Sequence, residues 1–288
     1  MIFAPTPLPT SPTLAPGASV PGPPQISFGY LGRAREGLHA RIELMRYIYF
    51  SPHLDDAILS AGGWIYDQTQ AGHSVEIWTF MCGFPEDTEL TDFAKSLHEE
   101  WGTSSAEETV RIRRAEDQKA SAMVGAKAVH FDFLDCIYRR GKNGEFLYPD
   151  TFVGSNPAEA DLPAQVAQTM IAWLKPDDFV IAQLAVGGHV DHLVVRSAAE
   201  LLHRSVAWIA DIPYLLNDPD DLAPKTAGMK DSTQPVSEAG LKVWQDAIEI
   251  YASQLSTLFD SPNVMRQKIS EYWAERKGMR FWKPAQTG

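Results

Sequence analysis

Two short segments carry most of the residues that could perform chemistry. The first is Ser51-Pro52-His53-Leu54-Asp55-Asp56, which lies between the apolar run 47–50 and the helix-forming run 57–59. The second is Gly187-Gly188-His189-Val190-Asp191-His192, which follows the apolar run 179–184. Imidazole and carboxylate groups at these spacings can face one metal ion. The two segments therefore predict a metal-dependent hydrolase.

A catalytic zinc site has three protein ligands and keeps one position open for water. His53, Asp56 and His192 would supply two nitrogens and one oxygen. Asp55 is adjacent to a ligand but would point to the other side of it, where it could take a proton from water. His189 could stabilise a developing oxyanion or protonate a leaving amine. Asp191 could accept a hydrogen bond from a histidine ring.

The donor set contains no thiolate. The two cysteines, Cys82 and Cys136, do not form a CxxC pair, so neither a thiolate zinc site nor a disulfide framework is expected. We predict that both are reduced and buried. Nitrogen and oxygen donors favour Zn²⁺ and are compatible with another divalent ion such as Fe²⁺.

The chain around these segments alternates between strand and helix patterns. Ser104 and Ser105, followed by Glu107 and Glu108, form a capping pattern at the start of a charged helix. The alternation predicts an α/β fold that is Rossmann-like, with a mainly parallel sheet and helices on both faces. Both chemical segments follow strands, so they could share one crevice at the carboxyl edge of the sheet. The predicted strands are 47–50, 74–80, 129–134 and 179–184, and the predicted helices are 56–70, 104–125, 158–174 and 189–204.

The last third of the chain is less regular. Residues 213–235 carry several Asp, Pro and Lys residues, which predicts a long loop. A helix follows, and its apolar stripe is expected to pack against the sheet. The stripe consists of Trp244, Ile248, Tyr251, Leu255 and Leu258.

Composition excludes several classes of partner. A formal net charge of −12 argues against nucleic acid or an anionic membrane surface, because both require a basic protein surface. No apolar run reaches the roughly 18 residues of a membrane span. The start of the chain lacks the pattern of a secretory signal, so a cytoplasmic location is expected.

The first residues differ in composition from the rest. Residues 1–24 contain eight of the 20 prolines and no charged residue. Proline-rich sequence without periodicity forms neither a helix nor a central strand. We therefore predict a disordered tail over residues 1–27 and a single domain over residues 28–288.

These motifs together resemble the PIG-L/LmbE family of zinc-dependent N-deacetylases over roughly residues 45–260. The resemblance rests on the strand–PHxDD–helix opening at His53 and on the later HxDH segment at His189. Leu54 and Val190 stand where the family usually has proline. Further similar features are Gly62-Gly63, Arg113-Arg114-Ala115-Glu116 with Val124-Gly125, Leu134-Asp135 and Tyr251-Ala252-Ser253-Gln254.

The resemblance implies a role for each matching residue. His53, Asp56 and His192 become zinc ligands, and Asp55 becomes the general base. It also implies that His189 is an electrostatic or acid partner oriented by Asp191. Two further residues, Arg113 and Asp135, fall where family members contact the sugar.

The implied reaction removes the acetyl group from an N-acetylglucosamine-type amide, giving a free amine and acetate. The partner is then a small-molecule N-acyl amino sugar. Two alternatives remain beside this reading. One is a zinc amidase that acts on a non-sugar N-acyl substrate in secondary metabolism. The other is a non-catalytic sugar-binding member of the same fold.

Overall fold

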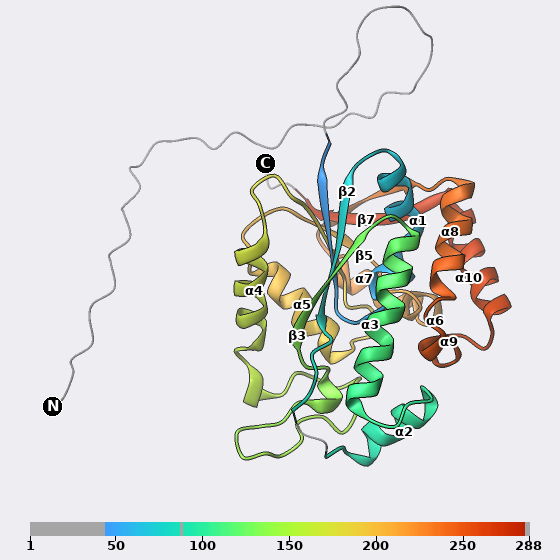
Figure 1. The fold of residues 1–288 in the computed structure, drawn as a ribbon. Helices are drawn as coiled ribbons and strands as arrows, with labels where there is room; N and C mark the ends of the chain where they lie inside the picture. The colour runs from blue at the N-terminus through green and yellow to red at the C-terminus, as the bar shows by residue number, and fades with distance from the viewer. Residues whose placement is uncertain (1–43, 87–88, 286–288) are drawn as a thin grey trace, which may run out of the picture. The chain divides into compact units, whose positions relative to one another are not determined.

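A seven-stranded sheet runs through the computed structural model, which describes residues 44–86 and 89–285. The strands lie in the order β3-β2-β1-β4-β5-β7-β6. The first five are parallel, β7 pairs antiparallel with β5, and β6 pairs antiparallel with β7. This mainly parallel sheet with helices around it confirms the predicted α/β fold class (Figure 1).

The strands agree with the predicted ones where the prediction placed them, and three more follow. They are β1 (Arg46–Ser51), β2 (Ser74–Met81), β3 (Lys127–Phe133), β4 (Phe179–Gln183), β5 (Val206–Ile209), β6 (Met229–Pro235) and β7 (Gly278–Pro284). The α-helices are α1 (Asp56–Gln70), α2 (Asp92–Glu100), α3 (Ala106–Met123), α4 (Leu162–Trp173), α5 (Val190–Glu200), α6 (Tyr214–Asn217), α7 (Leu222–Lys225), α8 (Glu238–Ile248), α9 (Ala252–Leu258) and α10 (Pro262–Arg276).

The place of β1 in the strand order determines where the crevice of the sheet lies. Its last four residues are buried, as expected for a parallel strand covered on both faces. From β1 the sheet extends through β2 to β3 on one side, and through β4 to β5 on the other. The junction of β1 and β4 is therefore a topological switch point, where open α/β sheets leave a crevice at the carboxyl ends of the strands.

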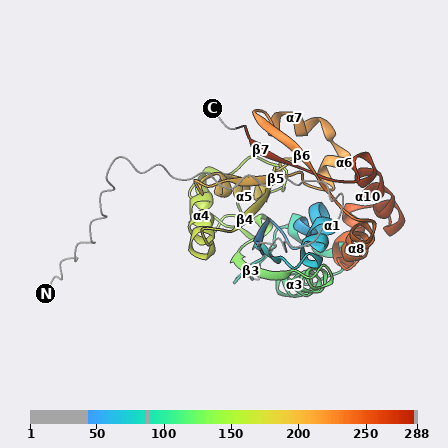
Figure 2. The same cartoon turned by 90° about the horizontal axis from the view of Figure 1, so that it is seen from above.

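Helices cover both faces of the sheet. In Figures 1 and 2, α4 and α5 lie on one face, and α1, α3, α8 and α10 lie on the other. The start of α3 follows the predicted capping pattern, because the Ser105 side chain accepts a hydrogen bond from the backbone N–H of Glu108. Helix α3 thereby begins at a fixed residue and directs one face toward the crevice.

The predicted helix after residue 235 is two helices, α8 and α9, separated at residues 249–251. The expected packing of its stripe against the sheet is also wrong at Trp244, which packs on α1. The indole Nε1 of Trp244 donates to the carbonyl oxygen of Ile58 at 2.7 Å. A Cβ atom at Gly62 would lie 2.7 Å from Trp244 Cδ1, so glycine at this position lets the indole approach the helix.

The long loop predicted over residues 213–235 is wrong as well. This segment contains α6, α7 and the edge strand β6. All seven residues of β6 pair with β7, although its sequence MKDSTQP is polar and only partly buried. Edge strands tolerate polar residues because one side faces water, so hydrophobic periodicity does not reveal them.

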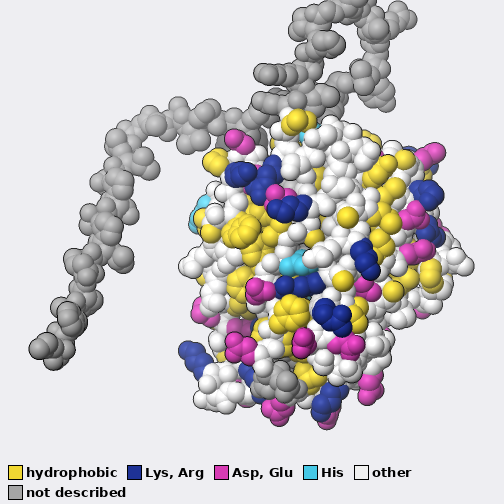
Figure 3. All heavy atoms as spheres, viewed as in Figure 1, with side chains coloured by type: hydrophobic (Ala, Val, Ile, Leu, Met, Phe, Trp, Pro, Cys, Tyr) yellow, Lys and Arg dark blue, Asp and Glu magenta, His cyan; other side chains and the backbone are white. Residues whose placement is uncertain are grey.

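No helix within residues 44–86 and 89–285 combines the length and apolar character that a bilayer crossing requires. On the face shown in Figure 3, acidic, basic and apolar side chains are interspersed, and no continuous basic area forms there. The predicted tail over residues 1–27 lies outside the described residues, as does the predicted boundary that follows it.

Candidate active site

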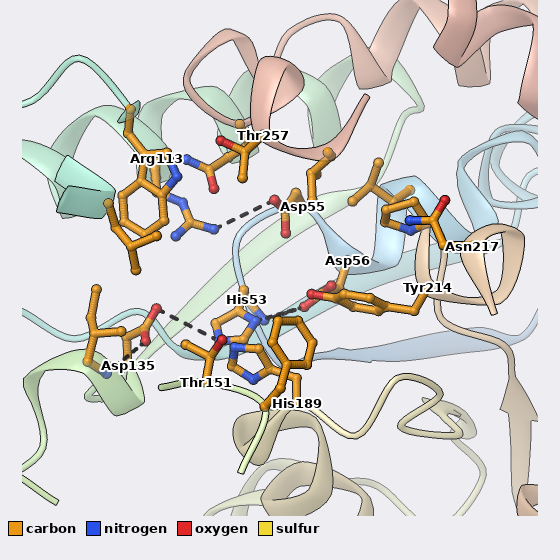
Figure 4. Close-up of a pocket in the computed structure, with 18 residues that line it drawn as sticks. His53, Asp55, Asp56, Arg113, Asp135, Thr151, His189, Tyr214, Asn217 and Thr257 are labelled. Carbon is orange, nitrogen blue, oxygen red and sulfur yellow. Dashed lines mark hydrogen bonds and ion pairs between the residues drawn. The ribbon is translucent and has the colours of Figure 1, made fainter. Parts of the chain in front are cut away.

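A cavity of about 250 Å³ opens at the carboxyl ends of β1 and β4. Its floor holds residues of both predicted chemical segments, and its outer wall is mostly uncharged (Figure 4). The floor residues are His53, Asp55, Asp56, Arg113, Asp135 and His189. The outer wall includes Leu97, Trp101, Ile137, Thr151, Phe152, Pro213, Tyr214, Asn217, Gln254, Thr257 and Leu258.

His53 is held by the turn between β1 and α1 and by a buried carboxylate. The Ser51 hydroxyl donates to the His53 carbonyl oxygen at 2.7 Å and accepts from the Ala57 N–H at 3.0 Å, which fixes the turn. On the ring, Nε2 lies 3.0 Å from Asp191 Oδ2, so Nδ1 is left facing Asp56 Oδ2 at 3.3 Å. Burial opposes protonation, but the hydrogen bonds to Asp191 and Asp56 raise the pKa of His53 well above its ordinary value.

His192, on the first turn of α5, is oriented in the same manner. Its Nδ1 lies 2.6 Å from Asp211 Oδ1, and its Nε2 lies 3.3 Å from Asp56 Oδ2. Burial lowers the pKa of His192, but Asp56 and Asp211 outweigh it and raise the pKa to about 9. Each imidazole therefore hydrogen-bonds one carboxylate, Asp191 for His53 and Asp211 for His192. Its other ring nitrogen faces Asp56.

These three side chains fit a divalent metal ion. His192 Nε2 is buried and has no hydrogen-bond partner among the described residues. Asp56 is only 4% exposed, yet its two imidazole neighbours outweigh the effect of burial and lower its pKa below the ordinary range. One nitrogen each of His53, His189 and His192 also lies within 4.8 Å of the others. A compact set of buried nitrogen and oxygen donors could hold a metal ion.

Asp55 faces the cavity beside this cluster. Its Oδ2 lies 3.6 Å from Nη2 of Arg113, which extends from α3 (Figure 4). Burial and the neighbouring Asp56 raise the pKa of Asp55 to about 7. The Arg113 guanidinium in turn lies over the Trp101 ring, 5.1 Å from its centroid. The structure thus brings Asp55 and Arg113 together on one side of the cavity.

His189 caps the N-terminus of α5. Its Nδ1 accepts from the backbone N–H of Asp191 at 3.1 Å, so the ring proton resides on Nε2. Gly187, with φ of 84°, lies before it in a turn where a Cβ atom would meet Tyr214 at 2.9 Å. Burial and the neighbouring His53 lower the pKa of His189 well below its ordinary value. This side chain is therefore a neutral hydrogen-bond donor at the cavity surface.

The carboxylate of Asp191 hydrogen-bonds the His53 ring, whereas the His189 ring is bonded by the backbone N–H of Asp191. Its Oδ2 accepts from the Cys136 N–H at 3.0 Å as well as from His53, and its Oδ1 pairs with Nη1 of Arg139. Burial alone would raise the pKa of Asp191, but the neighbouring Arg139 outweighs it, so this pKa lies below its ordinary range. His189 accepts its hydrogen bond from the backbone N–H of Asp191. Asp135 lines the same cavity, and its Oδ2 lies 3.8 Å from His53 Nε2.

Sequence reasoning missed Asp211 and Arg139. Asp211 follows β5, a four-residue apolar strand that was not predicted. A carboxylate directly after an apolar run is a usable signal, and it is the same signal that identified Asp55 and Asp56. Arg139 carries no comparable signal, because its partners Glu159 and Asp191 lie 20 and 52 residues away in the sequence.

Known proteins are similar to this chain in sequence or in fold. The 2'-N-acetylparomamine deacetylase of Streptomyces fradiae is 30% identical over 165 residues, which are 56% of this chain and 53% of that protein. The match thus spans about half the length of that curated relative. The solved A40926 pseudoaglycone deacetylase is 29% identical with a TM-score of 0.68, over 84% of this chain and 97% of that one. A deacetylase from the teicoplanin pathway is 25% identical with a TM-score of 0.75, over 85% of this chain and 100% of that one.

The family model described as PIG-L, GlcNAc-PI de-N-acetylase, matches residues 48–202. This range contains the last four residues of β1, all of β2 to β4, α5 and both chemical segments. It excludes Asp211 and the α9 wall of the cavity, which lie further along the chain. Since the matched range is more than half of the 288-residue chain, the protein belongs to the PIG-L family.

Proposed function

We propose that this protein is a metal-dependent hydrolase that removes the acetyl group of an N-acetylglucosamine-type amide. One observation carries the proposal. His53 and His192 converge on Asp56 at 3.3 Å each, directly beside the buried Asp55 on the cavity floor. Family membership supports it, and so do the names of two relatives, which are deacetylases of 2'-N-acetylparomamine and of the A40926 pseudoaglycone.

We infer that His53 Nδ1, Asp56 and His192 Nε2 would hold the metal ion. The carboxylates behind the two imidazoles support this choice, because each fixes its ring with one nitrogen directed at Asp56. Zn²⁺ is the ion proposed, and Fe²⁺ suits the same donors. When bound, the ion supplies a Lewis acid that polarises the acyl carbonyl and makes water more acidic.

Asp55 carries out the proton transfers, and His189 stabilises the developing negative charge. Water oxygen adds to the acyl carbon, and Asp55 takes the proton that water loses. The neutral Nε2–H of His189 donates a hydrogen bond to the oxygen on which negative charge develops. When the C–N bond breaks, the proton held by Asp55 passes to the nitrogen. The products are acetic acid and the free amine, and the proton that acetic acid loses near neutral pH protonates the amine.

Arg113 and Asp135 are proposed to contact hydroxyl groups of the substrate. Both line the cavity beside His53 and Asp55 (Figure 4). A cavity of about 250 Å³ has room for one sugar ring. We therefore propose a small-molecule partner.

A cytoplasmic location stays a prediction. A single catalytic domain over residues 28–288 is proposed as well.

The test measures acetate release by purified protein loaded with Zn²⁺. The panel contains N-acetylglucosamine, a neutral N-acetylglucosaminide, 2'-N-acetylparomamine and a non-sugar N-acetyl amine. Hydrolysis of a sugar substrate, lost on chelation and restored by Zn²⁺, supports the proposal. Hydrolysis of the non-sugar amide alone replaces it with the amidase alternative. Metal binding without release of acetate from any member would overturn the enzymatic assignment.

A further inference from the structure

Helix α9 forms part of the cavity wall but does not cap its own start. It has seven residues, and the side chain of Tyr251, which precedes it, makes no capping hydrogen bond. Glu116 of α3 takes that role. Its Oε1 accepts from the Ser253 N–H at 3.0 Å, and its Oε2 accepts from the Ser253 hydroxyl at 2.5 Å. A helix this short is not stable alone, and a carboxylate at its N-terminus stabilises it.

The neighbouring carboxylate makes a second connection. Asp117 Oδ1 accepts from the Tyr251 hydroxyl at 2.9 Å, and its Oδ2 lies 2.7 Å from Nε2 of His130 on β3. Asp117 and Tyr251 are each 1% exposed. Buried carboxylates are costly unless they are hydrogen-bonded, so these contacts favour one arrangement of α3, β3 and α9. We name Glu116, Asp117, Tyr251 and Ser253 the α9 latch.

The latch connects two parts of the cavity. Arg113, one turn before Glu116 on α3, reaches the cavity and approaches Asp55. Gln254, Thr257 and Leu258, which follow Ser253, line the cavity from α9. In the view of Figure 4, Arg113 and Thr257 lie along one side of the cavity, and His53 and His189 lie along the other. None of the four latch residues lines the cavity itself.

We propose that the α9 latch positions the α9 wall against Arg113 and thereby sets substrate affinity. The proposal rests on the deacetylase function proposed above. Latch residues act through α9 and are positioning residues. Glu116 and Ser253 hydrogen-bond to each other rather than to the metal-binding side chains or Asp55, so their loss weakens binding of the substrate and leaves the chemical step nearly unchanged. Asp117 is not varied, because its charge also helps to raise the pKa of Asp55. The α9 latch thus connects the motif Arg113–Glu116 on α3 with the motif Tyr251–Gln254 at the start of α9.

The test compares Glu116→Ala with Glu116→Gln in the full-length, metal-loaded protein. Glutamine can still accept from the Ser253 N–H and donate to its hydroxyl, so it should restore the latch. We expect KM to rise about tenfold in Glu116→Ala, which corresponds to about 1.4 kcal/mol. The expected kcat stays within about twofold. Ser253→Ala removes only the hydroxyl contact and should raise KM about threefold, which keeps the test informative if Glu116→Ala does not fold.

Gln245→Ala is the matched control. Gln245 is buried and bonds to Arg266 and Ser270 at 2.8 Å each, away from the cavity, so its loss perturbs the fold without touching the latch. Hydrogen exchange of amides 253–258 provides a readout independent of activity. It should accelerate in Glu116→Ala and remain unchanged in Glu116→Gln and Gln245→Ala.

The two proposals fail in different ways. If the wild type hydrolyses no N-acetyl sugar, the proposed function fails, while hydrogen exchange still tests whether the latch holds α9. If the wild type is active, three results overturn the latch. These are an unchanged KM in Glu116→Ala and Ser253→Ala, an equal defect in Glu116→Gln, and an equal rise of KM in Gln245→Ala.

Discussion

Replacing Asp211 by asparagine should weaken metal binding although Asp211 is not a proposed ligand. The Asp211 carboxylate accepts from both sides, with Oδ1 2.6 Å from His192 Nδ1 and Oδ2 2.8 Å from the Val186 N–H. Asparagine has one acceptor oxygen and one donor nitrogen in the same positions. Asparagine can therefore accept a hydrogen bond from only one of these two donors.

Both orientations of the asparagine carry a penalty. If the asparagine oxygen faces His192, the amide nitrogen faces the Val186 N–H. The buried Val186 N–H then loses its hydrogen-bond acceptor. With its nitrogen toward His192, the ring must accept at Nδ1, so its proton moves to Nε2. That nitrogen is the one that faces Asp56 at 3.3 Å. In the second orientation the imidazole must change tautomer before it can bind metal.

We expect a 10- to 100-fold loss of Zn²⁺ affinity, or about 1.4–2.7 kcal/mol, as is typical when a metal-binding histidine loses its hydrogen-bond partner. Competition with a chromophoric chelator measures the affinity. Asp221→Asn is the control, because Asp221 accepts from the nearby Gly187 N–H at 2.8 Å and contacts no histidine in the described residues. Equal Zn²⁺ affinity in wild type and Asp211→Asn would refute the inferred role of His192 Nε2.

Three further predictions test other parts of the site and fold. Asp55→Asn should lower kcat by about 10²- to 10⁴-fold, the contribution of a general base, while metal analysis shows unchanged zinc content; substantial residual turnover would exclude Asp55 as the base. His189→Ala should lower kcat by about 10²- to 10³-fold with zinc retained, whereas loss of zinc would make His189 a ligand. Burial opposes ionisation of Glu76, but hydrogen bonds to Arg46 and Trp78 lower the pKa of Glu76 below its ordinary 4.5. The stabilisation by Glu76 is therefore present above pH 4.5 and lost as the pH falls below it. The unfolding free energies of wild type and Glu76→Gln should converge over that range, and a constant gap would contradict the ion pair.

Local sequence patterns were sufficient for the crevice and for the histidines and adjacent aspartates of its floor, whereas Arg113 and Asp135 came from the family resemblance. His53, Asp55 and Asp56 lie within five residues of the end of β1, and His189 and His192 lie six and nine residues after the end of β4. The topology of parallel strands then places both segments at one edge. Polar β6 and the break between α8 and α9 could not be predicted, because edge position and helix packing override local periodicity.

The sequence by itself determined which residue types follow β1 and β4, and therefore that imidazoles and carboxylates meet at one sheet edge. Only the tertiary structure decided which nitrogen each imidazole presents. That choice depends on Asp191 behind His53 and Asp211 behind His192, which lie 138 and 19 residues away from their partners. The α9 latch likewise joins residues 134 and 137 positions apart. Hydrogen bonds between segments so distant in sequence arise only when the packed core brings them together, so no local pattern encodes them.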